Sequence, residues 1–195
     1  MRDHFFDKKY AENYHYRPYL AENRLMAENI TPKLTEFHIT IDSDGRWFHE
    51  GGEITRKRMV ALFATILSCD ETGQHWLRTP VEYGPVEVAD AAFIITAMHS
   101  EQTEDGQVIT MTDNIDRQYE LGSEFPLEIR TGGDGAIKPY LILERGVRAR
   151  LSHPVYYELA NLAEHNPDGM LGITSHQHFF SLETTDIPDS AGTDR

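Results

Sequence analysis

The sequence predicts an α+β fold of two similar units from an internal duplication. Each unit is expected to be an antiparallel, half-barrel-like sheet packed on one main helix. An amphipathic helical stripe followed by a turn and a strand recurs 96 residues later in this 195-residue chain. Hairpin turns between consecutive strands favour antiparallel sheets over a βαβ series.

The first main helix is expected over residues 54–67. Its apolar positions follow the i, i+3, i+4, i+7, i+8 spacing of a helix with one buried face, namely Met59, Leu62, Phe63, Ile66 and Leu67. A shift by the separation of Gly73 and Gly169 gives the second stripe, Val155, Glu158, Leu159, Leu162 and Ala163. Four of these five positions are apolar, so we expect a second helix there.

The remaining elements are expected to be strands joined by tight turns. Phe37–Ile41 alternates apolar and polar residues, as a half-buried strand does. Asp44-Gly45 and Asp105-Gly106 are hairpin turn signals, because glycine adopts the positive φ that such turns require.

Four segments are expected along the chain. Residues 1–34, rich in Tyr, His and charge, form an N-terminal helical extension. The first repeat unit covers residues 35–105 and the second covers residues 106–183. Residues 184–195 are expected to be a disordered acidic tail.

Composition narrows the classes of partner. The net charge of −14 disfavours nucleic acid and anionic membranes, which both attract clustered lysine and arginine. Cys69 is the single cysteine, so no intramolecular disulfide forms, which fits a reducing compartment. No apolar run approaches the ~20 residues of a membrane span, and the first residues lack a signal peptide's apolar stretch. We therefore expect a soluble, cytoplasmic protein without a cofactor; homo-oligomerisation stays open.

A candidate ligand site lies where the glycine pair Gly51-Gly52 precedes the first helix. The free amides of a helix N-terminus attract anions, and an arginine there can bind a carboxylate or phosphate through two hydrogen bonds. A small anionic ligand would be held by Arg56 or Arg78 beside an apolar wall. The expected binding residues are Trp47, His49, Arg56, Arg78, Thr79 and Glu82. The alternative is a glycine turn with a solvated arginine.

No catalytic or metal-ligating set is complete in the sequence. His176 and His178 have the spacing that places two strand side chains on one face, as two metal ligands require, but no third ligand is identifiable. Ser152-His153 lacks the G-x-S-x-G context of a nucleophile elbow. A small metal-dependent hydrolase using His49, Glu50 or the histidine pair is therefore the weakest of the alternatives.

Several phrases, taken together, resemble one bacterial family. They are Asp44-Gly-Arg-Trp47-Phe-His-Glu-Gly51, Ile54-Thr-Arg56, Met59-Val-x-Leu-Phe63, Leu77-Arg-Thr79-Pro80-Val-Glu82, Val86-x-Val88-x-Asp90, Thr112-Asp-Asn114, Pro139-Tyr140 and Leu171-Gly-Ile-x-Ser175. Their order and spacing over about residues 35–183 resemble the domain of unknown function 1285 (DUF1285) family. The resemblance implies a two-domain fold with repeated motifs and a link to signal transduction, and it supplies no catalytic residues.

Three functions are compatible with these observations. The favoured one is a non-catalytic module that binds a small ligand or acts as a sensor. The second is a protein-interaction or oligomeric scaffold protein that uses the Tyr-rich N-terminal segment. The third is the metal-dependent hydrolase.

Overall fold

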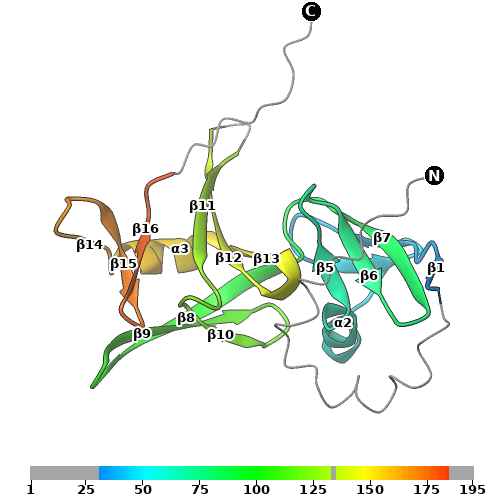
Figure 1. The fold of residues 1–195 in the computed structure, drawn as a ribbon, viewed down its shortest axis with the longest axis horizontal. Helices are drawn as coiled ribbons and strands as arrows, with labels where there is room; N and C mark the ends of the chain where they lie inside the picture. Colours follow the sequence, from blue (N-terminus) through cyan, green and yellow to red (C-terminus); the bar gives the residue numbers. More distant parts are fainter. Residues whose placement is uncertain (1–30, 133–134, 185–195) are drawn as a thin grey trace, which may run out of the picture.

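Strands dominate the structure, a computed structural model that describes residues 31–132 and 135–184 (Figure 1). This range contains three sheets, the α-helices α2 (Lys57–Ala64) and α3 (His153–Ala160), and the 3-10 turn η2 (Glu144–Gly146). None of these helices is long and apolar enough to cross a membrane. Most of the expected N-terminal extension and of the acidic tail lies outside the described residues.

The first sheet has seven strands with the order β4-β3-β2-β7-β6-β5, and β1 lies beside β7. The central strands β2 and β7 are parallel, whereas the other neighbours along this order are antiparallel. Two antiparallel meanders are thus joined through one parallel pair. The strands are β1 (Lys33–Leu34), β2 (Ile39–Ile41), β3 (Trp47–His49), β4 (Gly52–Glu53), β5 (Leu67–Cys69), β6 (His75–Arg78) and β7 (Glu82–Val88).

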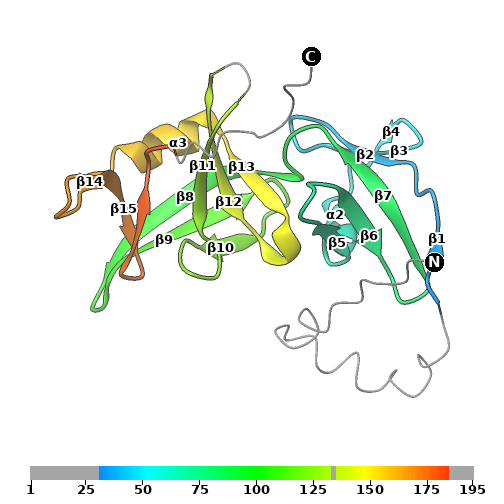
Figure 2. The same cartoon turned by 45° about the horizontal axis from the view of Figure 1, so that its top comes forward.

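The second sheet has six strands in the corresponding order β10-β9-β8-β13-β12-β11, again with a parallel central pair, β8 and β13. Its long β8–β9 hairpin extends away from the first sheet in both ribbon views (Figures 1 and 2). The strands are β8 (Phe93–Thr103), β9 (Gly106–Asp113), β10 (Gln118–Glu120), β11 (Leu127–Thr131), β12 (Ile137–Ile142) and β13 (Arg148–Leu151).

A small antiparallel sheet completes the described chain. It consists of β14 (Glu164–His165), β15 (Leu171–Ser175) and β16 (His178–Ser181). Ser175 Oγ accepts a hydrogen bond from the Ile109 amide at 3.1 Å, and the His176 amide donates to the Gln107 carbonyl at 3.0 Å. These bonds hold the small sheet against β9, while α3 packs on β8 and β15.

The predicted α+β class, with one main helix under each sheet, is wrong. The two helices have eight residues each, and sheet dominates the described chain. The helix α2 lies in the chain between β4 and β5, but the corresponding place in the second sheet, between β10 and β11, holds the Leu121–Phe125 turn region. The helix that the 96-residue shift relates to α2 is α3, which follows the second sheet.

The expected buried face of the first helix is also wrong. Met59 and Leu62 are 47% and 64% exposed, whereas Val60 and Ala64 are buried. The helix ends at Ala64 because the chain then enters β5, in which Leu67 pairs with Leu77 across the sheet. Because Leu67 lies in β5 and not in the helix, it is not part of the helix's buried face.

Polar contacts join the two large sheets. Asn114 donates to the Gly45 carbonyl at 3.0 Å and accepts from the Ile94 amide at 3.2 Å. Arg145 donates to the carbonyls of Ala64 and Leu67, at 2.8 and 2.7 Å, and so caps the C-terminal end of α2. The side chains that reach across, Asn114 and Arg145, both lie outside the strands, and no strand of one large sheet pairs with a strand of the other within the described residues.

A partly buried carboxylate, Asp90, provides the other part of this junction. It accepts a hydrogen bond from the Tyr140 hydroxyl at 2.7 Å and pairs with Arg150 Nε at 2.7 Å. Arg150 also donates to the Ser43 carbonyl at 2.9 Å, so one arginine bridges both sheets. Burial raises the pKa of Tyr140, and Asp90 adds to the effect, so this hydroxyl stays protonated as a donor.

Candidate functional site

The residues expected to form the anion site are divided between core and surface. Trp47 is 2% exposed, stacks on Phe63 at a centroid distance of 6.2 Å, and donates from Nε1 to the Ala92 carbonyl at 3.2 Å. Its side chain therefore belongs to the core under α2. His49 and Arg56 are exposed, at the end of β3 and at the N-cap of α2.

The other three expected residues lie together at the β6–β7 turn. The Arg78 guanidinium lies 5.3 Å from the Trp76 ring centroid and 5.6 Å from that of Tyr83. Thr79 Oγ1 donates to the Glu82 carbonyl at 3.0 Å, and the Glu82 amide donates back to the hydroxyl at 2.9 Å. These contacts shape a turn, and none of the six expected residues lines either pocket described below. The anion at Arg56 stays a prediction.

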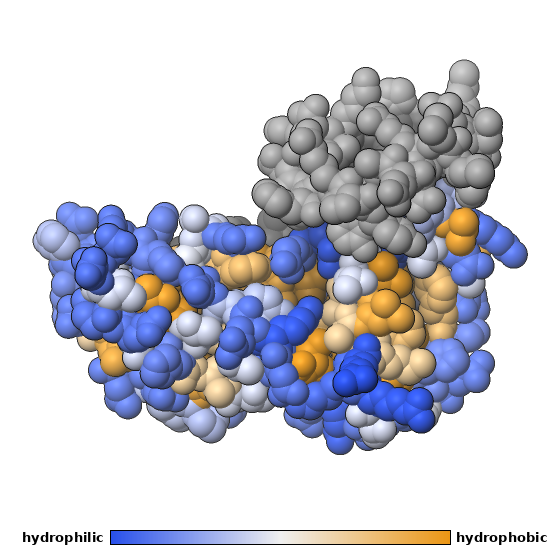
Figure 3. Space-filling model, turned by 90° about the horizontal axis from the view of Figure 1, so that it is seen from below, coloured by the Kyte–Doolittle hydropathy of each residue, from blue (hydrophilic) through white to orange (hydrophobic). Residues whose placement is uncertain are grey.

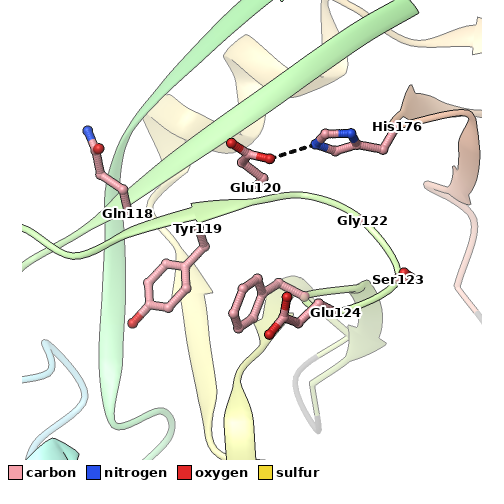
Figure 4. A pocket seen from close by; sticks show the side chains of 8 residues that line it. Gln118, Tyr119, Glu120, Gly122, Ser123, Glu124 and His176 are labelled. Carbon is pink, nitrogen blue, oxygen red and sulfur yellow. Dashed lines mark hydrogen bonds and ion pairs between the residues drawn. The ribbon is translucent and has the colours of Figure 1, made fainter. Parts of the chain in front are cut away.

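The candidate site instead lies in the second half of the chain, between β10 and the turn that joins β15 to β16 (Figure 4). We call it the β10 pocket. Its volume of about 480 Å³ falls within the ~300–1,000 Å³ usual for small-molecule sites. It is lined by Gln118, Tyr119, Glu120, Gly122, Ser123, Glu124, Phe125 and His176.

One side of the β10 pocket is formed by a contact between two sheets. Glu120 Oε2 lies 2.8 Å from His176 Nε2, although 56 residues separate the two in sequence. His176 and Gln177 both have positive φ, 47° and 62°, so they form the tight turn of the β15–β16 hairpin. Because the His176 amide is bonded to β9, the turn presents its imidazole to β10.

The opposite side is aromatic and rests on a charge pair whose carboxylate, Asp113, is buried. The Tyr119 and Phe125 rings pack edge to face at 5.1 Å. The Tyr119 hydroxyl donates to Asp113 Oδ2 at 3.2 Å, and Arg117 Nε donates to the same oxygen at 2.8 Å. Burial raises the pKa of Tyr119, so the phenol remains neutral. Tyr119 is 6% exposed, so Phe125 supplies most of the aromatic surface that a ligand can reach.

The two histidines that might ligate a metal do not share a face. The turn at His176–Gln177 interrupts the strand alternation, so His176 contacts Glu120 while His178 Nδ1 lies 2.8 Å from the His176 carbonyl. Over residues 31–132 and 135–184, no three His, Cys, Asp or Glu side chains group as a metal site.

A second pocket, of about 540 Å³, lies on the first sheet near Phe48 and Gly51. Asp42 and Glu87 contribute carboxylates to it. Asp42 is already engaged by Arg46, whose guanidinium nitrogen is 2.8 Å from Oδ2. Each pocket therefore has one carboxylate that is engaged within the chain, Asp42 here and Glu120 in the β10 pocket; the β10 pocket differs in being closed by a contact between two sheets.

Sequence reasoning missed the β10 pocket because its parts are distant in sequence. The loop Gly122–Phe125 carries the small and polar residues typical of a turn, which gives no functional signal by itself. The hairpin containing His176 becomes relevant only once it docks on β9. His176 is the one residue of this pocket that the sequence already indicated as functional, although the chemistry expected there was metal binding.

The fold and this pocket define a β protein of three sheets with a ligand-sized hollow between the second and the third. Residues 29–91 match the N-terminal domain of unknown function DUF1285, and residues 92–182 match the C-terminal domain of the same family. The chain therefore belongs to the DUF1285 family. The two matches meet in front of β8, whereas the unit boundary expected near residue 105 falls within the β8–β9 hairpin.

Two solved structures resemble this chain. A DUF1285 family protein from Silicibacter pomeroyi DSS-3 is 30% identical, with a TM-score of 0.70, over 80% of this chain and 85% of that chain. A DUF1285 family protein from Shewanella baltica OS155 is 26% identical, with a TM-score of 0.51, over 64% of this chain and 91% of that chain. The comparison with curated proteins finds no match.

Proposed function

We propose that this chain is a small-ligand-binding module and that its ligand is an organic cation bound in the β10 pocket. The observation that carries the proposal is the pairing of carboxylates with an aromatic wall. Glu120 and Glu124 line the pocket together with Phe125. An ammonium group can pair with a carboxylate and lie against an aromatic ring at the same time.

The charge balance of the pocket supports a cation over an anion. Its lining contains two carboxylates and no lysine or arginine. An anionic ligand would meet repulsion from both glutamates, whereas a cation would be attracted to both. The His176 imidazole forms its ion pair with Glu120, and Glu124 has no charged partner among the described residues.

The proposal includes a sensory role, because the strand that lines the pocket is linked to the first sheet. β10 directly follows the Asp113–Arg117 turn. In this turn Asn114 bonds to Gly45, and Asp116 pairs with Lys57 of α2 at 2.7 Å. A ligand that shifts β10 would alter these contacts, and hydrogen exchange of α2 with and without ligand would detect the change.

Thermal unfolding of the full chain with 1,4-diaminobutane and with succinate tests the ligand class. We expect the diamine to raise the melting temperature and succinate to leave it unchanged. Replacing Glu124→Gln removes a charge-assisted contact worth about 1.5–3 kcal/mol, so diamine affinity should fall roughly tenfold to hundredfold. Glu101→Gln, at an exposed position of β8, is the matched control and should bind as the parent does. Protection by succinate alone would contradict the proposal.

A further inference from the structure

The helix α2 presents apolar side chains to solvent on its outer face. Leu62 is 64% exposed and Met59 is 47% exposed. Arg58 is four residues before Leu62 and therefore lies on the same side of the helix. Figure 3 shows apolar surface on the half of the molecule that holds α2, with strongly hydrophilic residues beside it.

This outer face is basic, in a chain that carries 32 acidic and 18 basic residues. Lys57 is neutralised by Asp116, but the side chains of Arg56 and Arg58 have no acidic partner among the described residues. Exposed apolar side chains beside unpaired arginines are complementary to a partner surface that is apolar and negatively charged.

We propose that the outer face of α2 docks an acidic amphipathic helix of a partner protein. Leucine-type side chains of that helix would cover Met59 and Leu62, and its carboxylates would pair with Arg56 and Arg58. The positive charge of this face indicates which partner fits. Residues 1–30 of this chain hold five acidic and five basic residues, so they carry no net negative charge to pair with the arginines of α2. A membrane or a nucleic acid would be repelled by the net charge of −14.

The helix α2 is also held at both ends, as a rigid docking surface requires. Arg145 caps its C-terminal carbonyls, and Lys57 ties its first turn to Asp116 of the second unit. Phe63 stacks on Trp47 beneath it. A partner would therefore meet a preorganised surface, which lowers the entropic cost of association.

Fluorescence anisotropy of two synthetic 18-residue peptides with the full chain tests the docking proposal. Both peptides carry leucines at helical i, i+3, i+4 and i+7 spacing; one has glutamates beside the leucines and its twin has lysines. We expect the glutamate peptide to bind at least tenfold more tightly than its twin, a difference of about 1.4 kcal/mol. Equal affinity for the two peptides, or no binding by either, would overturn the proposal.

Variants of the full chain locate the binding. Leu62→Ser should weaken binding of the glutamate peptide roughly tenfold, and Arg58→Glu should reverse the preference towards the lysine peptide. Tyr157→Ser, at a 67% exposed position of α3, is the matched control and should change nothing. Unchanged binding by Leu62→Ser would overturn the proposal. So would Leu62-dependent self-association of the chain, or Leu62-dependent binding to phosphatidylserine vesicles.

Discussion

His75 is a buried histidine whose charge state matters for stability. It is 8% exposed, and its Nε2 has no hydrogen-bond partner within the described structure. Burial lowers the pKa of His75, the nearby Arg148 lowers it further, and a hydrogen bond with the Gly73 backbone opposes the change only in part. In the folded chain this side chain is therefore neutral at pH values where an unfolded chain would already bind a proton.

This difference predicts an acid-sensitive contribution to stability. Above the ordinary histidine pKa of about 6.5 both states are neutral and His75 contributes no penalty. As the pH falls below that value, the unfolded chain gains a proton that the folded chain rejects, so the free energy of unfolding decreases. Urea titrations at pH 7.5 and 5.5 should show a smaller acid loss in His75→Asn than in the parent. If His75→Asn and the exposed control His99→Asn behave alike, His75 is not the group responsible.

Gly84 shows how one residue lets two strands share an edge of β7. Lys33–Leu34 and Thr40–Ile41 pair with the same side of β7, at its beginning and at its end. The intervening chain passes so close that a Cβ on Gly84 would collide with the Thr35 carbonyl oxygen and would lie 2.7 Å from the Phe37 ring. Only glycine leaves the backbone of β1 in place.

We therefore predict that Gly84→Ala destabilises the first sheet by roughly 2–3 kcal/mol, because the backbone has to move to admit the methyl group. Gly52→Ala is the control in the same sheet, since its nearest neighbour, the His49 carbonyl, is 3.5 Å away. That change should cost less than about 1 kcal/mol. Denaturant unfolding measures both, and equal losses would show that the close approach of β1 does not matter.

In the molecule as a whole, Asp90 is a partly buried charge at the junction of the two large sheets. Its side chain is 14% exposed and pairs with Arg150, which reaches across to Ser43. Asp90→Ala should cost about 3–5 kcal/mol, because it leaves Arg150 half-buried without its carboxylate. The two sheets should then unfold in separate calorimetric transitions. Lys57→Ala breaks an exposed pair across the same junction and should cost under about 1 kcal/mol with one transition retained.

Local features of this fold could be predicted from the sequence, whereas its long-range pairings could not. The turns at Asp44-Gly45 and Asp105-Gly106 and helices within the two apolar stripes follow from nearby residues. The parallel pairing of β2 with β7 and of β8 with β13 depends on contacts between segments about 50 residues apart, which no local periodicity encodes. The resulting sheets, rather than the helices, decide the fold class.

The candidate site was less predictable for the same reason. Trp47 belongs to a strongly patterned phrase, yet the register of β3 directs its ring under α2 and towards Ala92. Asp90, Asn114 and Tyr140, which also belong to the phrases typical of the family, join the sheets. The residues that most clearly identify the family thus form the junction between the two large sheets. The pocket is formed partly by the turn Gly122–Phe125, whose composition is that of an ordinary turn.

A crystal structure of the full chain grown with 1,4-diaminobutane is the sharpest test of cation binding in the β10 pocket. We expect the diamine in this pocket, with one ammonium group within hydrogen-bond distance of Glu124 and the chain of methylene groups against Phe125. In crystals of Glu124→Gln grown at the same diamine concentration, the site should be markedly less occupied. A diamine bound elsewhere, or an empty β10 pocket at concentrations that saturate the thermal shift, would show that this pocket is not a cation site.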